Sequence, residues 1–353
     1  MLSKINLFKE IYKDPDRKPI FKIISEVLSL AIYHRCIPRL YFSRYLFKVG
    51  RTNIKNYLPS DFLDKVTSFF NDKEVTNIVE NKLYFNFFYS QFKISLPKIF
   101  MYNHRKMFVV GNNSFEINSV HDFKVQIENI FKQNRSYDSI FIKKTYGSYG
   151  GNNVYRLSNY ECKTDAKRIT DLYYEVIKTG FLFQETIKQH SEMNRLNPSC
   201  LNSIRIDTFI DSDEKVEIIS AFVRISVKNS HIDNNSFGGY AIGINLKDGK
   251  LKKEGYTMPS YGIKVLTAHP ITYVIFENFK IPFFDQVKEL VKKAASFMPG
   301  LRLIGWDVAI GESGPILIEG NSGYATDLNE LLDGGYRDNA TYQKVLREYN
   351  YSS

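Results

Sequence analysis

The sequence predicts an α+β protein built from two or three packed lobes, and three observations lead to this expectation. The chain has 353 residues, more than one ordinary hydrophobic core accommodates. Segments with the apolar spacing of helices alternate with short apolar runs that are typical of strands. Several of these strands follow one another closely, which indicates antiparallel hairpins rather than a doubly wound parallel sheet.

The elements are expected in the following order. Apolar residues three and four positions apart in residues 19–35 predict a helix within a helical N-terminal region, 1–75. A helix around residues 77–92 follows, and from residue 139 the pattern changes to that of strands. Strands are expected at residues 98–103, 106–111, 139–144, 153–157, 180–187, 203–210, 216–226, 240–246, 303–310 and 315–321, and further helices at 166–178 and 283–297.

The composition is that of a globular protein with reduced thiols. Apolar residues make up 43% of the chain and charged residues 24%, which argues against disorder. No apolar run reaches the roughly 18 residues that span a bilayer, and the N-terminus lacks the apolar stretch of a signal peptide. Cys36, Cys162 and Cys200 are far apart, which disfavours disulfides and structural zinc. We expect a cytoplasmic protein, either free or peripheral at the inner face of the membrane.

The formal net charge of +10 favours anionic partners, but no helix-turn-helix, RNP or zinc-finger pattern indicates nucleic acid. Residues 33–55 combine basic and aromatic side chains without an acidic residue. This segment either docks on an anionic membrane or glycan, or forms helices with buried aromatic rings and solvated basic groups, and we favour the second interpretation. The side chains concerned are Arg35, Arg39, Arg44, Lys48, Arg51 and Lys55, with Tyr33, Tyr41, Phe42, Tyr45 and Phe47 between them.

A candidate metal site lies in the C-terminal third, where two carboxylates interrupt apolar strands. Asp307 stands in the first strand of a predicted hairpin and Glu319 in the second, and Asn321 shares a strand face with Glu319. Burying a lone carboxylate costs several kcal/mol, so a cation or a polar partner must compensate. Three oxygen ligands suit Mg²⁺, and the alternative is a carboxylate pair satisfied by lysine or arginine.

The length of the hairpin loop decides whether the carboxylates meet. A two-residue loop would turn Asp307 away from Glu319, whereas a three-residue loop, 312–314, sets them directly across from each other. We predict the three-residue loop, with Gly314 in the left-handed conformation. Loss of either carboxylate is expected to remove most turnover and to leave the fold largely intact.

A glycine-rich loop joins two strands between residues 144 and 153. Its small residues let backbone N–H groups approach phosphate, and Lys143 precedes it at a strand end. The loop does not open a helix, so it is not a Walker P-loop. A plain mobile hairpin is the alternative. The loop residues concerned are Gly147, Ser148, Gly150 and Gly151.

The order of these elements resembles the ATP-grasp superfamily, and more closely the sugar-transfer-associated ATP-grasp proteins of polysaccharide assembly, over about residues 75–335. The resemblance rests on Asn81-Lys82 followed by the SLP motif, on FQETI at 183–187, on LNSIRIDTF, and on the metal hairpin. Ser203 replaces the family's threonine, and Val-Lys-Asn at 227–229 stands where glycines are usual. The resemblance implies an N-terminal lobe at 76–138, a small lobe at 139–186 and a large lobe at 187–353.

The resemblance also implies ATP and Mg²⁺ as cofactors, with two ions bound and Mn²⁺ as an alternative. Lys82 and Lys143 would hold phosphates beneath the glycine-rich loop, and Lys143, Arg205 and Arg224 would act in catalysis. The nucleotide base and ribose would be read by Gln184, Glu185, Ile187 and Glu192. Substrate contacts would come from Asp233, Asn234, Gly238, Gly239 and His269, although Asp233-Asn234 equally suits a turn cap and His269 a structural histidine.

The implied activity is that of a carboxylate–amine ligase of the acid–amino acid type. ATP would activate a carboxylate as an acyl-phosphate, and an amine would then displace phosphate to give an amide. The expected substrates are an amino acid and an acidic or amino sugar of a surface polysaccharide, capsule or O-antigen, or of its precursor. The alternatives are a kinase acting on a glycan or small molecule, and a non-catalytic module that binds polyanions or membranes.

Overall fold

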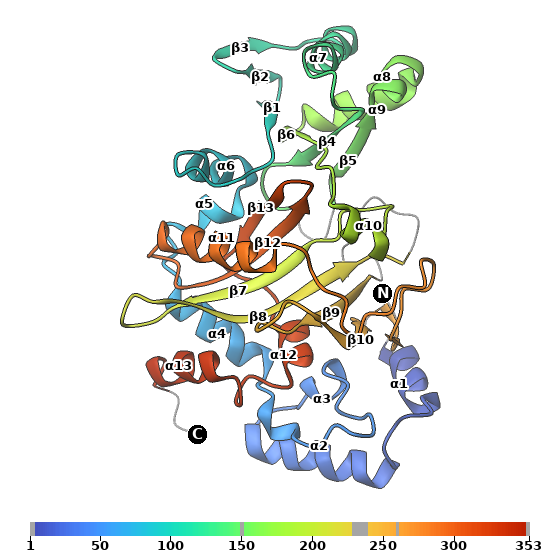
Figure 1. Ribbon diagram of the computed structural model, residues 1–353, viewed down its shortest axis with the longest axis vertical. Helices are drawn as coiled ribbons and strands as arrows, with labels where there is room; N and C mark the ends of the chain where they lie inside the picture. Colours follow the sequence, from blue (N-terminus) through green and yellow to red (C-terminus); the bar gives the residue numbers. More distant parts are fainter. Residues whose placement is uncertain (1–3, 149–151, 228–238, 259–260, 351–353) are drawn as a thin grey trace. The chain divides into compact units, whose positions relative to one another are not determined.

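The computed structural model describes residues 4–148, 152–227, 239–258 and 261–350, which fall into two compact units (Figure 1). Unit 1 comprises Met1–Thr76, Gln189–Pro315 and Gly320–Ser353, and unit 2 comprises Asn77–Lys188 and Ile316–Glu319. The Asp233, Asn234, Gly238, Gly150 and Gly151 positions of the predicted sites lie outside the described residues. Within the described ranges, no helix is both long and apolar enough to cross a membrane.

Unit 1 is built on a seven-stranded sheet in the order β11-β10-β9-β8-β7-β12-β13, with helices on both sides. The pairs with a described register are all antiparallel, and every residue of β7 and β12 is buried. Figure 1 shows α11 on one side of the sheet and α4, α12 and α13 on the other. The strands are β7 (Ile204–Ile210), β8 (Val216–Ile225), β9 (Tyr240–Ile244), β10 (Leu251–Thr257), β11 (Val265–Leu266), β12 (Leu303–Gly311) and β13 (Gly314–Asn321).

The N-terminal helices pack on the sheet of unit 1. Apolar side chains of α1, α2 and α3 join Phe222, Ala241 and Tyr256 of the sheet and the apolar side of α12 in one core cluster. The helices of unit 1 are α1 (Lys4–Lys13), α2 (Ile20–His34), α3 (Leu40–Ser43), the 3₁₀ turn η1 (Ile54–Asn56), α4 (Ser60–Phe70), α10 (Ser191–Leu196), α11 (Phe284–Ser296), α12 (Asp327–Asp333) and α13 (Ala340–Glu348).

Unit 2 contains a six-stranded sheet in the order β3-β2-β1-β6-β4-β5, backed by helices. In its core, the buried faces of α7, α8 and α9 pack against apolar side chains of β1, β2, β4, β5 and β6. The elements are α6 (Lys82–Ser90), β1 (Ile99–His104), β2 (Met107–Val110), β3 (Asn113–Glu116), α7 (Val120–Gln133), β4 (Ser139–Lys144), β5 (Val154–Ser158), α8 (Asn159–Thr164), α9 (Ala166–Val176) and β6 (Gly180–Glu185), and α5 (Thr76–Glu80) begins at the end of unit 1.

The helix expected over residues 77–92 is divided into α5 and α6 at Asn81. The Asn81 side chain accepts hydrogen bonds from the backbone N–H groups of Leu83 and Tyr84, so it caps the N-terminus of α6. An asparagine that caps one helix has extended backbone angles and cannot continue the helix before it. Lys82 thereby becomes the first residue of α6.

A buried ion pair joins the N-terminal helices to α12. Arg44 and Glu330 are both fully buried, and the Nε of Arg44 lies 3.0 Å from Oε2 of Glu330. The other carboxylate oxygen accepts the backbone N–H of Leu58. Burial raises the pKa of Glu330 to about 7, although Arg44 and the Leu58 N–H act in the opposite direction. The N-terminal region is therefore part of the core of unit 1.

We expect Arg44→Met to lower the free energy of unfolding by about 3–5 kcal/mol at pH 8, because it leaves the Glu330 carboxylate buried without its cation. Urea unfolding followed by circular dichroism measures this change. Arg39→Met is the matched control, since Arg39 is an exposed arginine of the same segment. Equal stability losses in the two variants would contradict the structural role of the pair.

Candidate active site

The register of the central strands brings Arg205 and Asp307 together. β7 and β12 pair so that Arg205 lies directly opposite Asp307, and directly opposed residues share one face of a sheet. The Nε of Arg205 donates to Oδ1 of Asp307 at 2.6 Å, and Nη2 donates to Oδ2 at 3.2 Å. Both side chains are almost completely buried. This is a bidentate arginine–carboxylate pair, in which two N–H groups donate to the two carboxylate oxygens, the strongest geometry for such an interaction.

Arg224 of β8 completes a three-residue ion cluster. Its Nη1 donates to Oδ2 of Asp307 at 2.9 Å, and β8 pairs with β7 so that Phe222 stands opposite Arg205. Arg224, two residues further along, therefore lies on the same face as Arg205. Burial alone would raise the pKa of Asp307, but the two guanidinium groups outweigh it and hold this pKa below its usual range. Asp307 is a stable anion whose charge is compensated by arginine, as in the alternative that the sequence left open, and the two arginines are the ones expected to act in catalysis.

A second buried carboxylate lies next to this cluster. Asp207 of β7 pairs with Gly305 in register, and its Oδ2 accepts hydrogen bonds from Ser220 and Asn329. Burial raises the pKa of Asp207 to about 7, although Arg205 and the Ser220 hydroxyl act in the opposite direction. Sequence reasoning missed this residue, even though IRIDTFI shows the same signal as the Asp307 strand, a carboxylate within an apolar run.

Gly305 leaves room for the aromatic ring that packs on this cluster. A Cβ at Gly305 would lie 2.9 Å from Cγ of Tyr324 and 3.2 Å from Nη1 of Arg205. The guanidinium of Arg205 lies 5.7 Å from the centre of the Tyr324 ring, within the range of a cation–π contact. Tyr324 is a further residue of the site that sequence reasoning missed.

The hairpin that carries the predicted metal ligands is one residue tighter than expected. β12 ends at Gly311 and β13 begins at Gly314, so the connection contains Glu312 and Ser313 rather than three residues. Gly314 has a φ of +140°, which favours glycine. The amide of Asn321 donates to the carbonyl of Gly305 at 3.3 Å, which ties the end of β13 to β12. The expected three-residue loop is therefore wrong, and the direct opposition of Asp307 and Glu319 that depended on it does not follow from this connection.

Unit 2 contains a second contact between a candidate phosphate ligand and a candidate metal ligand. Lys82, placed by the Asn81 cap, lies with its Nζ 3.0 Å from Oε2 of Glu319. Its backbone N–H donates to the carbonyl of Thr145, directly after β4. Lys143 belongs to β4, where it pairs with Leu182 and Val154.

The described part of the glycine-rich loop has the backbone freedom that its composition predicts. Gly147 has a φ of +70°, in the left-handed region. Ser148 is nearly buried, and its hydroxyl donates to the carbonyl of Lys144 at 3.2 Å. The hydroxyl therefore fastens the loop to the end of β4, which leaves the phosphate contacts of this loop as a prediction.

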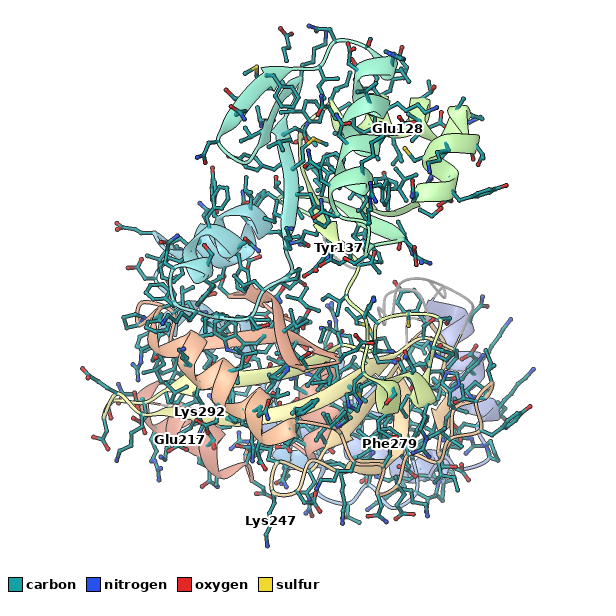
Figure 2. The ribbon with its side chains drawn as sticks, turned by 45° about the horizontal axis from the view of Figure 1, so that its top comes forward. Glu128, Tyr137, Glu217, Lys247, Phe279 and Lys292 are labelled. Carbon is teal, nitrogen blue, oxygen red and sulfur yellow. The ribbon has the colours of Figure 1, made fainter. Side chains whose placement is uncertain are left out.

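The predicted base-reading residues lie on β6 and after it. Gln184 is buried between β1 and β4, opposite Ile99 and Phe141. Glu185 accepts hydrogen bonds from the hydroxyl of Tyr137 and from the backbone N–H of Lys98. Tyr137, labelled in Figure 2, lies in the connection between α7 and β4.

The hydrogen bond to Glu185, with burial, raises the pKa of the Tyr137 hydroxyl to about 12. The Glu185 side chain is thus held by unit 2 itself, and the neighbouring Ile187 is half-buried. Glu192, the ribose candidate, belongs to α10 of unit 1 and pairs with Arg195 at 2.6 Å.

Of the candidate substrate residues, the structure describes Gly239 and His269. Nδ1 of His269 accepts the backbone N–H groups of Ile271 and Thr272, and Nε2 lies 3.0 Å from the carbonyl of Ser226. Both ring nitrogens are therefore engaged by the backbone, in agreement with the structural alternative for this histidine. Gly239 immediately precedes β9 and is buried.

The side chains present fit a hard divalent cation by their chemistry. Asp307, Glu319 and Asn321 offer carboxylate and amide oxygens, and the bond from the Asn321 amide N–H to Gly305 leaves its oxygen to act as a ligand. No group of three or more His, Cys, Asp or Glu side chains gathers as a metal centre within the described ranges. The predicted set contains only two carboxylates, so phosphate oxygens and water would have to complete the shell.

Comparison with known proteins identifies the chain. A family model described as sugar-transfer associated ATP-grasp matches residues 62–334, well over half of the sequence. The chain belongs to the sugar-transfer-associated ATP-grasp family. The α+β fold and the family resemblance expected from the sequence are confirmed.

Solved structures of other ATP-grasp enzymes are similar to this ATP-grasp chain at low identity. N5-carboxyaminoimidazole synthase from Aspergillus clavatus is 11% identical with a TM-score of 0.41, over 75% of this chain and 51% of that one. D-cycloserine synthetase is 10% identical with a TM-score of 0.47, over 82% and 80% of the two chains. D-alanyl-alanine synthetase A from Vibrio cholerae is 12% identical with a TM-score of 0.43, over 78% and 66%.

The matched region spans about half of the Aspergillus enzyme, 51% of its chain. No protein of curated function matches the sequence.

The ion cluster changes what we expect of Asp307. We predict that Asp307→Asn lowers the free energy of unfolding by about 3–5 kcal/mol at neutral pH, because the buried Arg205 and the partly buried Arg224 lose their anion. The folded-state pKa is depressed, so the stabilisation is present above the ordinary pKa of about 4 and is lost as the pH falls below it. Urea unfolding at pH 7 and pH 3 measures both effects.

Glu319→Gln is the control for that measurement, since the pair with Lys82 is partly exposed and contributes at most about 1 kcal/mol. A stability loss for Asp307→Asn no larger than this control would contradict the role of the cluster in the fold.

Asp207 is expected to make stability fall with rising pH. Its folded-state pKa of about 7 lies above the ordinary value of about 4, so the folded state binds more protons between these two pH values. We predict that Asp207→Asn gains stability relative to the unsubstituted protein between pH 5 and pH 8, by a few kcal/mol at most. Asp213→Asn, at an exposed aspartate, serves as the control. A pH-independent difference for Asp207→Asn would refute the assignment.

Proposed function

We propose that this protein is an ATP-dependent carboxylate–amine ligase that forms an amide through an acyl-phosphate. The observation that supports this proposal most directly is that, inside each unit, a candidate phosphate ligand contacts a candidate metal ligand. Arg205 contacts Asp307 at 2.6 Å in unit 1, and Lys82 contacts Glu319 at 3.0 Å in unit 2. Such ion pairs suit a magnesium–phosphate complex. Its Mg²⁺ can replace the arginine or lysine as the partner of each carboxylate, and its phosphate oxygens can replace the carboxylate as the partner of each arginine or lysine.

The chain's residues would supply positioning and charge rather than covalent chemistry. Asp307, Glu319 and Asn321 would hold Mg²⁺, which neutralises phosphate charge when it is bound with ATP. Arg205 and Arg224 would then face the phosphoryl group and the carboxylate under attack, since each guanidinium donates several N–H groups in fixed directions.

Nucleotide contacts would come from unit 2. Lys82 and Lys143 would bind phosphate oxygens, and the loop from Gly147 would cover them and exclude water. Gln184 and the backbone after Glu185 would contact the base. The Glu185 carboxylate is already engaged by Tyr137, so its contribution is to fix this strand end.

For substrates, we propose an amino acid and a sugar that carries a carboxylate or an amine, within a surface polysaccharide or its precursor. The family description, which associates these ATP-grasp proteins with sugar transfer, supports this choice. The net charge of +10 suits an acidic glycan or a nucleotide-linked uronic acid. A kinase that uses the same nucleotide residues is the second candidate, since phosphoryl transfer to a hydroxyl requires the same charges.

Hydroxylamine trapping distinguishes the two activities. With ATP, Mg²⁺ and a panel of uronic acids and amino acids, a ligase releases ADP and phosphate and yields a hydroxamate. We expect Arg205→Lys to lower the rate of hydroxamate formation on the order of 10²-fold, because lysine cannot make the two-pronged contact. Arg302→Lys is the control, since Arg302 pairs with Glu348 and has no assigned role. A phosphorylated sugar without hydroxamate would favour the kinase.

A further inference from the structure

α2 has two apolar sides, and only one of them is covered. Ile23 and Leu30 are buried in the core cluster of unit 1. The other side is exposed to solvent and contains large apolar side chains, which are not expected on an ordinary solvated helix face. Their exposed fractions are Ile20 39%, Phe21 88%, Ile24 50%, Leu28 57% and Ile32 79%.

The exposed side chains form one continuous stripe. At 100° per residue, Ile20, Ile24, Leu28, Phe21 and Ile32 fall within an arc of about 120°. The stripe runs the length of a helix of 15 residues, about 22 Å, and Ile37 beyond its C-terminus is 78% exposed. Figure 1 shows α2 at the lower edge of unit 1, with no other element on its outer side.

Basic side chains flank the stripe. Residues 1–60 contain twelve Lys and Arg against four Asp and Glu, so they account for +8 of the net charge of +10. Two of the acidic residues are neutralised locally, Glu26 by Lys18 and Asp14 by Lys48. Of the exposed basic side chains, Lys22 is on α2, Arg35 and Arg39 follow it directly, and Nζ of Lys55 lies 5.0 Å from the ring centre of Tyr33 on α2.

Most of the aromatic side chains that the sequence singled out in residues 33–55 do not form this surface. Tyr41, Tyr45 and Phe47 are fully buried, and their rings pack in the core cluster of unit 1. Within residues 33–55, Tyr33 at the end of α2 is 41% exposed and Arg35, Arg39 and Lys55 are exposed, whereas Arg44 is fully buried. The exposed apolar surface therefore lies on α2 itself, mainly before residue 33.

We propose that α2 docks in the headgroup region of an anionic lipid bilayer, with its exposed stripe toward the acyl chains and its basic flank on the lipid phosphates. An apolar stripe with a basic rim is the combination that binds such interfaces. A second copy of the chain would bring two positive rims together, which opposes self-association through this face. A nucleic acid would leave the apolar stripe uncovered. The inference does not depend on the proposed ligase activity.

Co-sedimentation with vesicles tests the proposal. The full chain is incubated with vesicles of phosphatidylcholine and phosphatidylglycerol in a 7:3 ratio, and with phosphatidylcholine alone. We expect binding to the anionic vesicles only. The variant Ile24→Gln/Leu28→Gln/Ile32→Gln should reduce partitioning at least about tenfold. The matched control, Ile271→Gln/Ile275→Gln, changes two isoleucines that are 58% and 66% exposed elsewhere in unit 1 and should bind normally.

The charge contribution is tested separately. Arg35→Gln/Arg39→Gln should weaken binding to anionic vesicles severalfold, as should raising the salt concentration, because the basic rim is screened. Lys167→Gln/Lys178→Gln removes two exposed lysines of unit 2 and should leave binding unchanged. Equal effects of the two charge variants would show a non-specific attraction and overturn the assignment to α2.

Cys36 provides a direct report of docking. It is exposed two residues beyond α2, whereas Cys162 and Cys200 are buried, so a thiol-reactive polarity-sensitive fluorophore labels it selectively. Anionic vesicles should shift its emission to shorter wavelength, and the triple glutamine variant should abolish the shift. The proposal is overturned if neither sedimentation nor the shift occurs. A concentration-dependent dimer that the triple variant dissociates would also overturn it and assign the face to self-association.

Discussion

The ion cluster of Asp307, Arg205 and Arg224 constrains the centre of unit 1. Two buried charged side chains, Arg205 and Asp307, and the partly buried Arg224 stand on three adjacent strands, and burying these charges without one another is costly. A slip of one residue between β7 and β12 would turn Asp307 to the opposite face and leave both arginines without their anion. The cluster therefore specifies strand register. Gly305 lacks a side chain where Tyr324 and Arg205 approach most closely, so it leaves room for both.

The same contacts set a condition on ligand binding. Asp307 and Glu319 already have cationic partners, so a metal ion that binds them must displace arginine and lysine. The displaced cations would be costly to leave unpaired, and phosphate oxygens are suitable new partners for them. Under the proposed function, metal and nucleotide would then bind more strongly together than separately, because each compensates the charges that the other releases.

The sequence predicted which positions carry functional side chains better than it predicted which residues those side chains contact. Asp307 was recognisable because a carboxylate in an apolar strand requires compensation, but its arginine partners depend on strand register, which local pattern does not specify. Asp207 carried the same signal and was overlooked. α7 was missed although it carried two helix signals: the Ser119 N-cap, which accepts from the N–H of Asp122, and the apolar residues Phe123, Ile127 and Ile130 at helical spacing. The hairpin connection was misjudged by one residue, since Gly314 suits a loop and a strand start alike.

α2 shows most clearly where sequence pattern stops being informative. Its apolar residues have helical spacing on two sides, and periodicity alone does not tell which side a core will cover. The buried side joins the cluster that contains Phe222, on the same strand as Arg224, and Ala241, directly opposite Arg224 on β9. Arg44 adds a buried ion pair to Glu330 of α12, so these helices are fixed to the sheet by packing and by charge. A partner that bound the outer side of α2 would therefore be connected to the sheet that carries the ion cluster through core packing and an ion pair rather than through a linker.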